Sequence, residues 1–201
     1  MYNKKKEGRE RGQMKYIIEH MEPSLFKWCE IEYRNISKIV GKENLIFTNI
    51  KAKDSKKLEK YGKVYSKSVA LLGLDLKKTC LLDQSAEKEL SKDDSKRFDC
   101  MVFGGILGDF PRRERTGKLN EKILCEKRHL GNEQFSTDNA VLVTSLILKG
   151  KRLQDINFQD GIEIETDEGE SVCFPFRYVL VKGKPFISEE LVEYLKKRNG
   201  F

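Results

Sequence analysis

Short apolar runs alternate with longer amphipathic segments along most of the chain, and this alternation restricts the possible folds more than any other feature. Strand-length apolar runs occupy residues 15–20, 44–50, 79–83, 99–104 and 122–128. Between the first two runs, apolar residues recur at helical spacing, and we expect a helix from Pro23 to about Val40 that ends at Gly41. Strands that alternate with helices are typical of βαβ units, so the sequence predicts an α/β fold around a parallel sheet.

The rest of the chain carries further helix and hairpin signals. The expected elements are a short helix at 91–97, a helix at 138–149 capped by Ser136, Thr137 or Asp138, a hairpin within 174–187 that turns at Lys182-Gly183-Lys184, and a last helix capped by Ser188. An acidic stretch, residues 160–170, precedes the hairpin. The lysine-rich segment 51–67 fits either a helix or a mobile insertion.

Length and composition favour one domain without metal or membrane segments. A chain of 201 residues is near the usual size of a single domain. The longest strongly apolar stretch, 140–148, is far shorter than the roughly 20 residues that cross a bilayer. The five cysteines are scattered without metal-ligand spacing, which favours reduced thiols. We therefore expect a cytoplasmic protein with a basic flexible tail, 1–13, and a single domain, 14–201.

The net charge of +7 is concentrated in two segments. Residues 1–13 contribute +3 and residues 51–67 contribute +5. Such basic segments suit contact with the phosphates of RNA or of a ribosome. A solvated tail and helix face would give the same pattern, so the charge alone leaves both interpretations open.

Polar and glycine residues stand where several predicted strands end. In open α/β sheets, ligands bind beyond the carboxyl ends of the strands. Glu19 and His20 end the first strand, Asp83 the third, and Gly104 to Asp109 follow the fourth. A second glycine-containing loop, His129 to Ala140, leads into a helix. The GGxxGD spacing is not the dinucleotide fingerprint and no P-loop motif occurs, which excludes those two readings, although glycines also end strands for steric reasons.

Four ordered blocks give the chain a specific resemblance. They are MKYIIEHMEP (14–23), FGGILGDFPRRERT (103–116), HLGNEQFSTDNAV (129–141) and FPFRYVLVKGKPF (174–186). They resemble the SPOUT class of methyltransferases, in particular the family that includes the fungal protein-arginine methyltransferase. The resemblance implies a Rossmann-like parallel sheet with a C-terminal deep trefoil knot, and S-adenosyl-L-methionine bound in the loops of the knot. It also implies a monomer, although most knotted methyltransferases dimerise and the sequence does not decide between the two states.

The resemblance also assigns site residues. The donor-binding positions that it carries over are Phe103, Gly104, Gly105, Leu107, Gly108, Asp109, Leu130, Gly131, Gln134, Phe135, Ser136 and Thr137. An arginine acceptor has a pKa above about 12, so a carboxylate must orient it and favour loss of a proton. Asp109 is the first candidate for this role and Glu19 the second, with Asp138 as an alternative and His20 as a possible relay. Each acid could instead cap a helix or pair with Arg112, Arg113 or Arg115.

Three functions follow from these observations. The first is methylation of an arginine side chain of a ribosomal protein, as the resemblance implies, and the acidic stretch 160–170 would attract such a basic substrate. The second is methylation of rRNA or tRNA, for which the basic segments and the arginines at 112, 113 and 115 could grip phosphates. The third is a non-catalytic module that binds a ribosome or RNA, against which the intact glycine loops argue.

Overall fold

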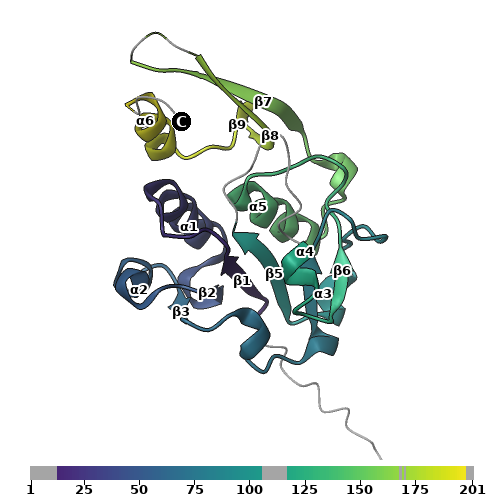
Figure 1. Ribbon diagram of the computed structural model, residues 1–201. Helices are drawn as coiled ribbons and strands as arrows, with labels where there is room; N and C mark the ends of the chain where they lie inside the picture. The colour runs from purple at the N-terminus through teal and green to yellow at the C-terminus, as the bar shows by residue number, and fades with distance from the viewer. Residues whose placement is uncertain (1–12, 106–116, 168, 170, 198–201) are drawn as a thin grey trace, which may run out of the picture.

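A six-stranded parallel sheet forms the centre of the computed structural model, which describes residues 13–105, 117–167, 169 and 171–197 (Figure 1). The strands are β1 (Lys15–His20), β2 (Leu45–Thr48), β3 (Lys63–Val64), β4 (Thr79–Leu82), β5 (Cys100–Gly105) and β6 (Glu126–Arg128). Their order in the sheet is β3-β2-β1-β5-β4-β6, and every pairing is parallel. The predicted α/β fold with a parallel sheet is therefore confirmed.

Alternate residues of the strands point to opposite faces of this sheet, as strand geometry requires. Ile18 and Phe47 belong to a core shared with α1 (Lys27–Val40) and α5 (Thr137–Leu148). Ile17 and Val102 belong to a second core with the segments around Val69 and 119–123. The short helices α2 (Ala52–Leu58), α3 (Asp94–Arg97) and α4 (Gly117–Asn120) lie in the connections between strands. Both faces of the sheet are therefore covered.

The C-terminal part adds a separate small layer on α1. It contains the antiparallel strands β7 (Phe158–Glu165), β8 (Ser171–Val181) and β9 (Lys184–Pro185), and the helix α6 (Glu189–Lys196). Lys182 and Gly183, which form the predicted hairpin turn, both have positive φ. Ile31 of α1 packs in one core with Phe174 and Phe176 of β8 and with α6. Helix α1 thus holds the C-terminal layer against the sheet (Figure 1).

Several expected boundaries differ from the structure. The helix expected from Pro23 begins at Lys27, because residues 23–26 fold into a loop over the end of β1. The strand expected at 122–128 is only Glu126–Arg128. The acidic stretch contributes to β7, and the segment 51–67 contains both α2 and β3. Ser136 stands at the N-cap of α5 without a side-chain cap bond, whereas the Ser188 hydroxyl accepts from the Leu191 amide as expected.

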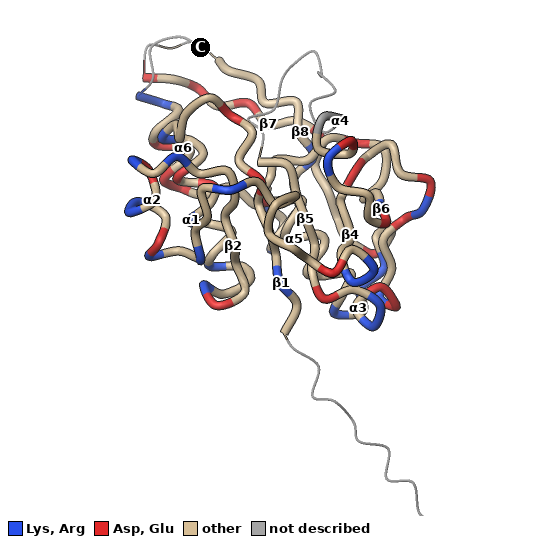
Figure 2. Tube along the Cα trace, turned by 60° about the horizontal axis from the view of Figure 1, so that its bottom comes forward, with Lys and Arg blue, Asp and Glu red and all other residues tan. Residues whose placement is uncertain are grey.

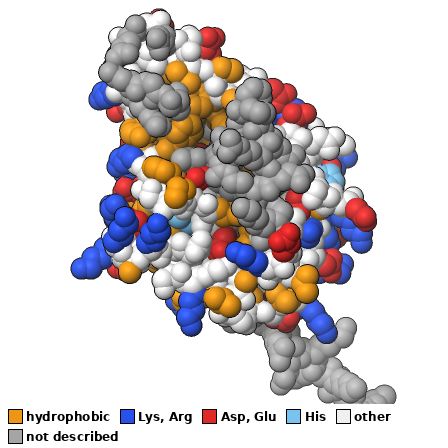
Figure 3. All heavy atoms as spheres, in the orientation of Figure 1, with side chains coloured by type: hydrophobic (Ala, Val, Ile, Leu, Met, Phe, Trp, Pro, Cys, Tyr) orange, Lys and Arg blue, Asp and Glu red, His pale blue; other side chains and the backbone are white. Residues whose placement is uncertain are grey.

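Charge is unevenly distributed over the surface. The seven lysines of residues 51–67 are all exposed, and Figure 2 shows blue positions gathered along α2 and its flanks. The space-filling view shows Lys and Arg side chains on the same side (Figure 3). Within the described part of the chain, no helix is both long enough and apolar enough to cross a bilayer, and no group of three or more metal-ligating side chains occurs.

Candidate active site

The parallel register brings several of the predicted site residues to one edge of the sheet. Glu19 and His20 at the end of β1 pair with Gly104 and Gly105 at the end of β5. Strand β4 separates β5 from β6, and the second glycine loop follows β6 at the same carboxyl edge. The two glycine bends therefore lie at one edge of the sheet, as a shared ligand site requires. Leu107, Gly108 and Asp109 lie outside the described residues.

Close packing, in addition to any ligand, explains the glycine at position 105. A Cβ there would lie 2.4 Å from the Tyr33 hydroxyl and 2.8 Å from Ile18 Cγ2. The Gly105 carbonyl accepts a hydrogen bond from the Met21 amide at 3.1 Å, which closes the end of β5 onto the residues after β1. Phe103 is 2% exposed and stacks on Tyr16, so its side chain belongs to the hydrophobic core.

The second glycine loop is anchored on the C-terminal layer. Gly131 has φ of +93°, and its amide donates to Nδ1 of His129 at 3.0 Å. The Gln134 carbonyl accepts from the Arg177 amide of β8 at 2.7 Å, and Phe135 packs against Phe158 of β7. Leu130 is buried, and Ser136 and Thr137 begin α5. The chain between β6 and α5 is thus held by β8 on one side and by the sheet on the other.

Glu19 occupies a buried position in which three donors surround its carboxylate. Its side chain accepts from the Thr48 hydroxyl at 2.5 Å, the Ser68 hydroxyl at 2.6 Å and the Val69 amide at 2.9 Å. The residue is only 3% exposed. These bonds tie β1, β2 and the segment after β3 together, so the geometry favours an anchoring role. Participation in catalysis remains a prediction for Glu19, as it does for Asp109.

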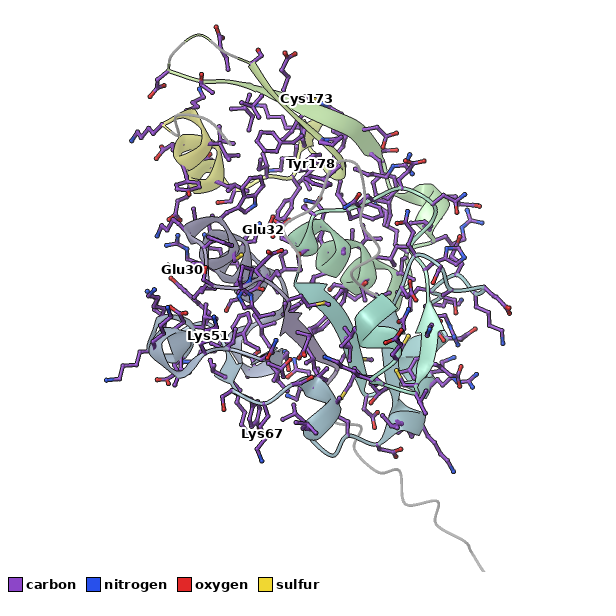
Figure 4. The ribbon with its side chains drawn as sticks, viewed as in Figure 1. Glu30, Glu32, Lys51, Lys67, Cys173 and Tyr178 are labelled. Carbon is purple, nitrogen blue, oxygen red and sulfur yellow. The ribbon has the colours of Figure 1, made fainter. Side chains whose placement is uncertain are left out.

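A buried pair of acidic residues, one of which sequence reasoning missed, lies between α1 and α5. Asp138 accepts from Asn35 Nδ2 at 2.8 Å, and from the Ser136 hydroxyl at 2.7 Å. Glu32 accepts from Trp28 Nε1 at 2.9 Å. Burial, with the nearby charge of Asp138, raises the pKa of Glu32 to about 8, and burial also raises the pKa of Asp138. Figure 4 shows Glu32 between α1 and α5, below Tyr178 of β8.

A glutamine at position 32 should stabilise the protein at alkaline but not at acidic pH. Because the folded pKa of Glu32 is about 8 against 4.5 for a free carboxyl, the folded state binds more protons between these values and loses stability as the pH rises through them. Glu32→Gln removes this loss and keeps an oxygen for Trp28. We expect its gain in unfolding free energy to grow by a few kcal/mol, on the order of one per pKa unit, from pH 5 to pH 8 in urea titrations. Glu30→Gln, on the same helix, is the control, and a gain independent of pH would contradict the prediction.

The fold defines the class of the protein: an α/β protein with a parallel sheet, in which two glycine-containing segments stand at the carboxyl edge where open sheets of this kind bind ligands. The model of the family described as protein arginine N-methyltransferase SFM1-like matches residues 15–200, and the chain belongs to this family. The protein arginine N-methyltransferase SFM1 of Saccharomyces cerevisiae is 39% identical, over 92% of this chain and 95% of the yeast protein.

Solved structures agree with this membership. The yeast arginine methyltransferase SFM1 complexed with SAM superimposes with a TM-score of 0.84 at 38% identity, covering 92% of this chain and 91% of the other. Its complex with SAH gives a TM-score of 0.82 at 38% identity, covering 90% and 94%. The expected class of enzyme, a methyltransferase that uses S-adenosylmethionine, is confirmed at the level of the family, which leaves the non-catalytic interpretation without support.

A more distant structure shares the fold only. The dual-specific Trm10 of Thermococcus kodakaraensis is 16% identical and superimposes with a TM-score of 0.56, over 71% of this chain and 95% of its own. At that identity the likeness concerns the arrangement of the sheet and its helices. It leaves open which acceptor this chain methylates.

Proposed function

We propose that this chain transfers a methyl group from S-adenosylmethionine to the side chain of an arginine in a ribosomal protein. The observation that supports it most strongly is the family match, which extends over residues 15–200 and includes both glycine bends. The proposal includes the SPOUT-type deep trefoil knot, a single catalytic domain from residue 14 onward, a cytoplasmic location and a monomeric state. Residues 106–116, which follow β5, lie outside the described residues.

The residues at the carboxyl edge fit a donor of this kind. Gly104 and Gly131 are only half-buried and carry no side chain that would block an approach to their backbone, and Leu130 and Phe135 are apolar residues of the second glycine loop. When bound, S-adenosylmethionine supplies an activated methyl group on its sulfonium, so that the protein mainly has to align the acceptor nitrogen. We propose that Asp109 orients the acceptor guanidinium and favours loss of its proton. Glu19 holds the end of β1 against β2 and the segment after β3, and acid–base participation by Glu19 is the second assignment to test.

Two surfaces of opposite charge are proposed to contact the ribosome. The exposed lysines around α2 suit phosphates of ribosomal RNA. Asp160, Glu163 and Glu165 of β7 are exposed and suit a basic protein segment, although Asp160 already forms a bidentate pair with Arg177 at 2.6 and 2.8 Å. RNA methylation is the alternative that the lysine surface keeps open.

Labelled ribosomes separate these acceptors. The purified chain is incubated with ribosomes and with S-adenosylmethionine that carries a radiolabelled methyl group, and the product is divided between nuclease and protease. We expect the acid-precipitable label to survive nuclease and to be released by protease. Label that is released by nuclease and resists protease would overturn the protein acceptor and favour RNA.

A further inference from the structure

A pocket opens beside the proposed donor site, at the carboxyl ends of β1 and β2. Its volume is about 180 Å³, and its walls are the segment 20–25 on one side and the segment 49–54 on the other. A single water needs only about 10–15 Å³, so the pocket has room for a side-chain head group. His20 in the wall pairs with Gly105 in the sheet register, and the Met21 amide donates to the Gly105 carbonyl. The pocket therefore adjoins the first glycine bend.

The wall of this pocket contains a buried nitrogen that lacks a partner. His20 is 3% exposed; its Nδ1 lies 2.8 Å from the Tyr33 hydroxyl, but its Nε2 has no hydrogen-bond partner among the described residues. The Ser24 carbonyl is near enough to the ring to raise its pKa, yet it does not meet hydrogen-bond geometry with Nε2. A buried polar atom without a partner destabilises the folded state, which points to a ligand that completes it.

The remaining groups around the pocket favour a cation. Burial lowers the pKa of His20 more than Ser24 and the neighbouring carboxylates raise it, so the ring is neutral near pH 7 and Nε2 is able to accept a hydrogen bond. Two carboxylates, those of Glu22 and Asp54, also belong to the lining of the pocket.

The charged groups of the lining already have some partners within the protein. Asp54 is 5% exposed and pairs with Lys57 at 2.9 Å, while the ammonium of Lys51 is bonded to the Pro23 carbonyl. Lys51 lies where α2 begins (Figure 4).

We propose that this pocket binds the guanidinium group of the acceptor arginine, with Nε2 of His20 accepting one of its N–H groups and Glu22 and Asp54 balancing its charge. A guanidinium presents several N–H donors in a plane and no acceptor, which suits a pocket bordered by an imidazole nitrogen, carboxylates and a carbonyl. A phosphate would be repelled by the same carboxylates. The inference rests on the proposed function, because it assumes an arginine acceptor, but it concerns binding and has its own test.

The two histidines of the chain, His20 and His129, make the pocket accessible to NMR. The protein, saturated with S-adenosylhomocysteine, is titrated with N-acetyl-arginine-amide, and His20→Gln assigns the two imidazoles. We expect a saturable shift of the His20 resonances alone, and no such shift with the N-acetyl-norleucine-amide control. Three results would overturn the inference: the His20 resonances do not shift, the His129 resonances shift equally, or a nucleoside monophosphate shifts the His20 resonances and the arginine compound does not.

Kinetics on ribosomes distinguish a failure of the pocket from a failure of the proposed function. Glu22 is half-buried, and its replacement by glutamine is conservative. We therefore expect the Glu22→Gln variant to fold, which a thermal melt will verify. We expect its KM for the ribosomal acceptor to rise at least tenfold with the affinity for the donor unchanged. Glu43→Gln, exposed at the opposite edge of the sheet, is the matched control. An unchanged KM would refute the role of the pocket in binding the acceptor arginine and would leave the proposed function intact. If the parent protein labels no arginine at all, the proposed function is refuted instead. The NMR titration would then still test whether the pocket binds a guanidinium group.

Discussion

Glu19→Ala is expected to lower the free energy of unfolding by about 3–5 kcal/mol, among the largest losses that a single side chain of this fold can produce. The change leaves the Val69 amide and the hydroxyls of Thr48 and Ser68 without their common acceptor, inside a site that is 3% exposed. Urea titration monitored by circular dichroism measures the loss. Glu59→Ala, exposed after α2, is the control and should change stability by less than about 0.5 kcal/mol.

Glu19→Gln separates anchoring from catalysis. The amide keeps one oxygen and nearly the same volume, so we expect a loss of about 1–2 kcal/mol and a decrease in kcat of less than tenfold. A general base contributes about 10²–10⁴ to the rate. A decrease in kcat of a hundredfold or more, in a variant that unfolds at the same urea concentration as the parent, would contradict the anchoring role and assign Glu19 to proton transfer.

Gly105→Ala should destabilise the protein by about 1–3 kcal/mol and weaken the binding of S-adenosylmethionine, because the new methyl group overpacks the contact between β5 and α1. Its Cβ would be 2.4 Å from the Tyr33 hydroxyl and 2.8 Å from Ile18 Cγ2. Calorimetry of donor binding and urea titration measure the two effects.

A double-mutant cycle tests the cause of this loss. Tyr33→Phe removes the hydroxyl that the new methyl group meets first, so we expect Gly105→Ala to cost less in that background than in the parent. Tyr33→Phe alone also removes the hydrogen bond to His20, and the cycle subtracts that contribution. Equal costs in both backgrounds would show that the hydroxyl is not the source of the strain.

The sequence predicted the central strands better than the peripheral elements. The runs that became β1 and β5 have continuously apolar centres and end in polar or glycine residues, so local pattern and position in the sheet agree. Strand β3 has only two residues and forms through pairing with β2, which local sequence does not encode. Strand β7 was not predicted, because its many acidic residues are typical of a solvated turn. The alternation in Ile162-Glu163-Ile164-Glu165 is nevertheless typical of a strand, and Ile164 is buried while both glutamates are exposed.

The candidate site was predictable only in part. Strand ends and glycines predicted that Glu19, His20, Gly104 and Gly105 meet at one edge of the sheet, because parallel strands share their carboxyl ends, and the register brings them together there. Glu32 was not predicted as a site residue, although it stands on the apolar face of α1 between Trp28 and Ile36, where a carboxylate is unusual. The buried contacts of Glu19 and the pocket beside His20 depend on segments that are distant in sequence, Ser68 and Asp54 among them, and only the folded chain brings these together.

The identity of the labelled amino acid tests the central claim most directly. The purified chain is incubated with ribosomes and S-adenosylmethionine labelled in the methyl group, the ribosomal proteins are hydrolysed to amino acids, and the hydrolysate is separated beside methylated standards. Methylation of an arginine side chain predicts that the label elutes with a methylated arginine, and that an Asp109→Asn enzyme yields much less of it. Label that elutes with any other methylated amino acid, or that remains entirely in the RNA, would contradict the account.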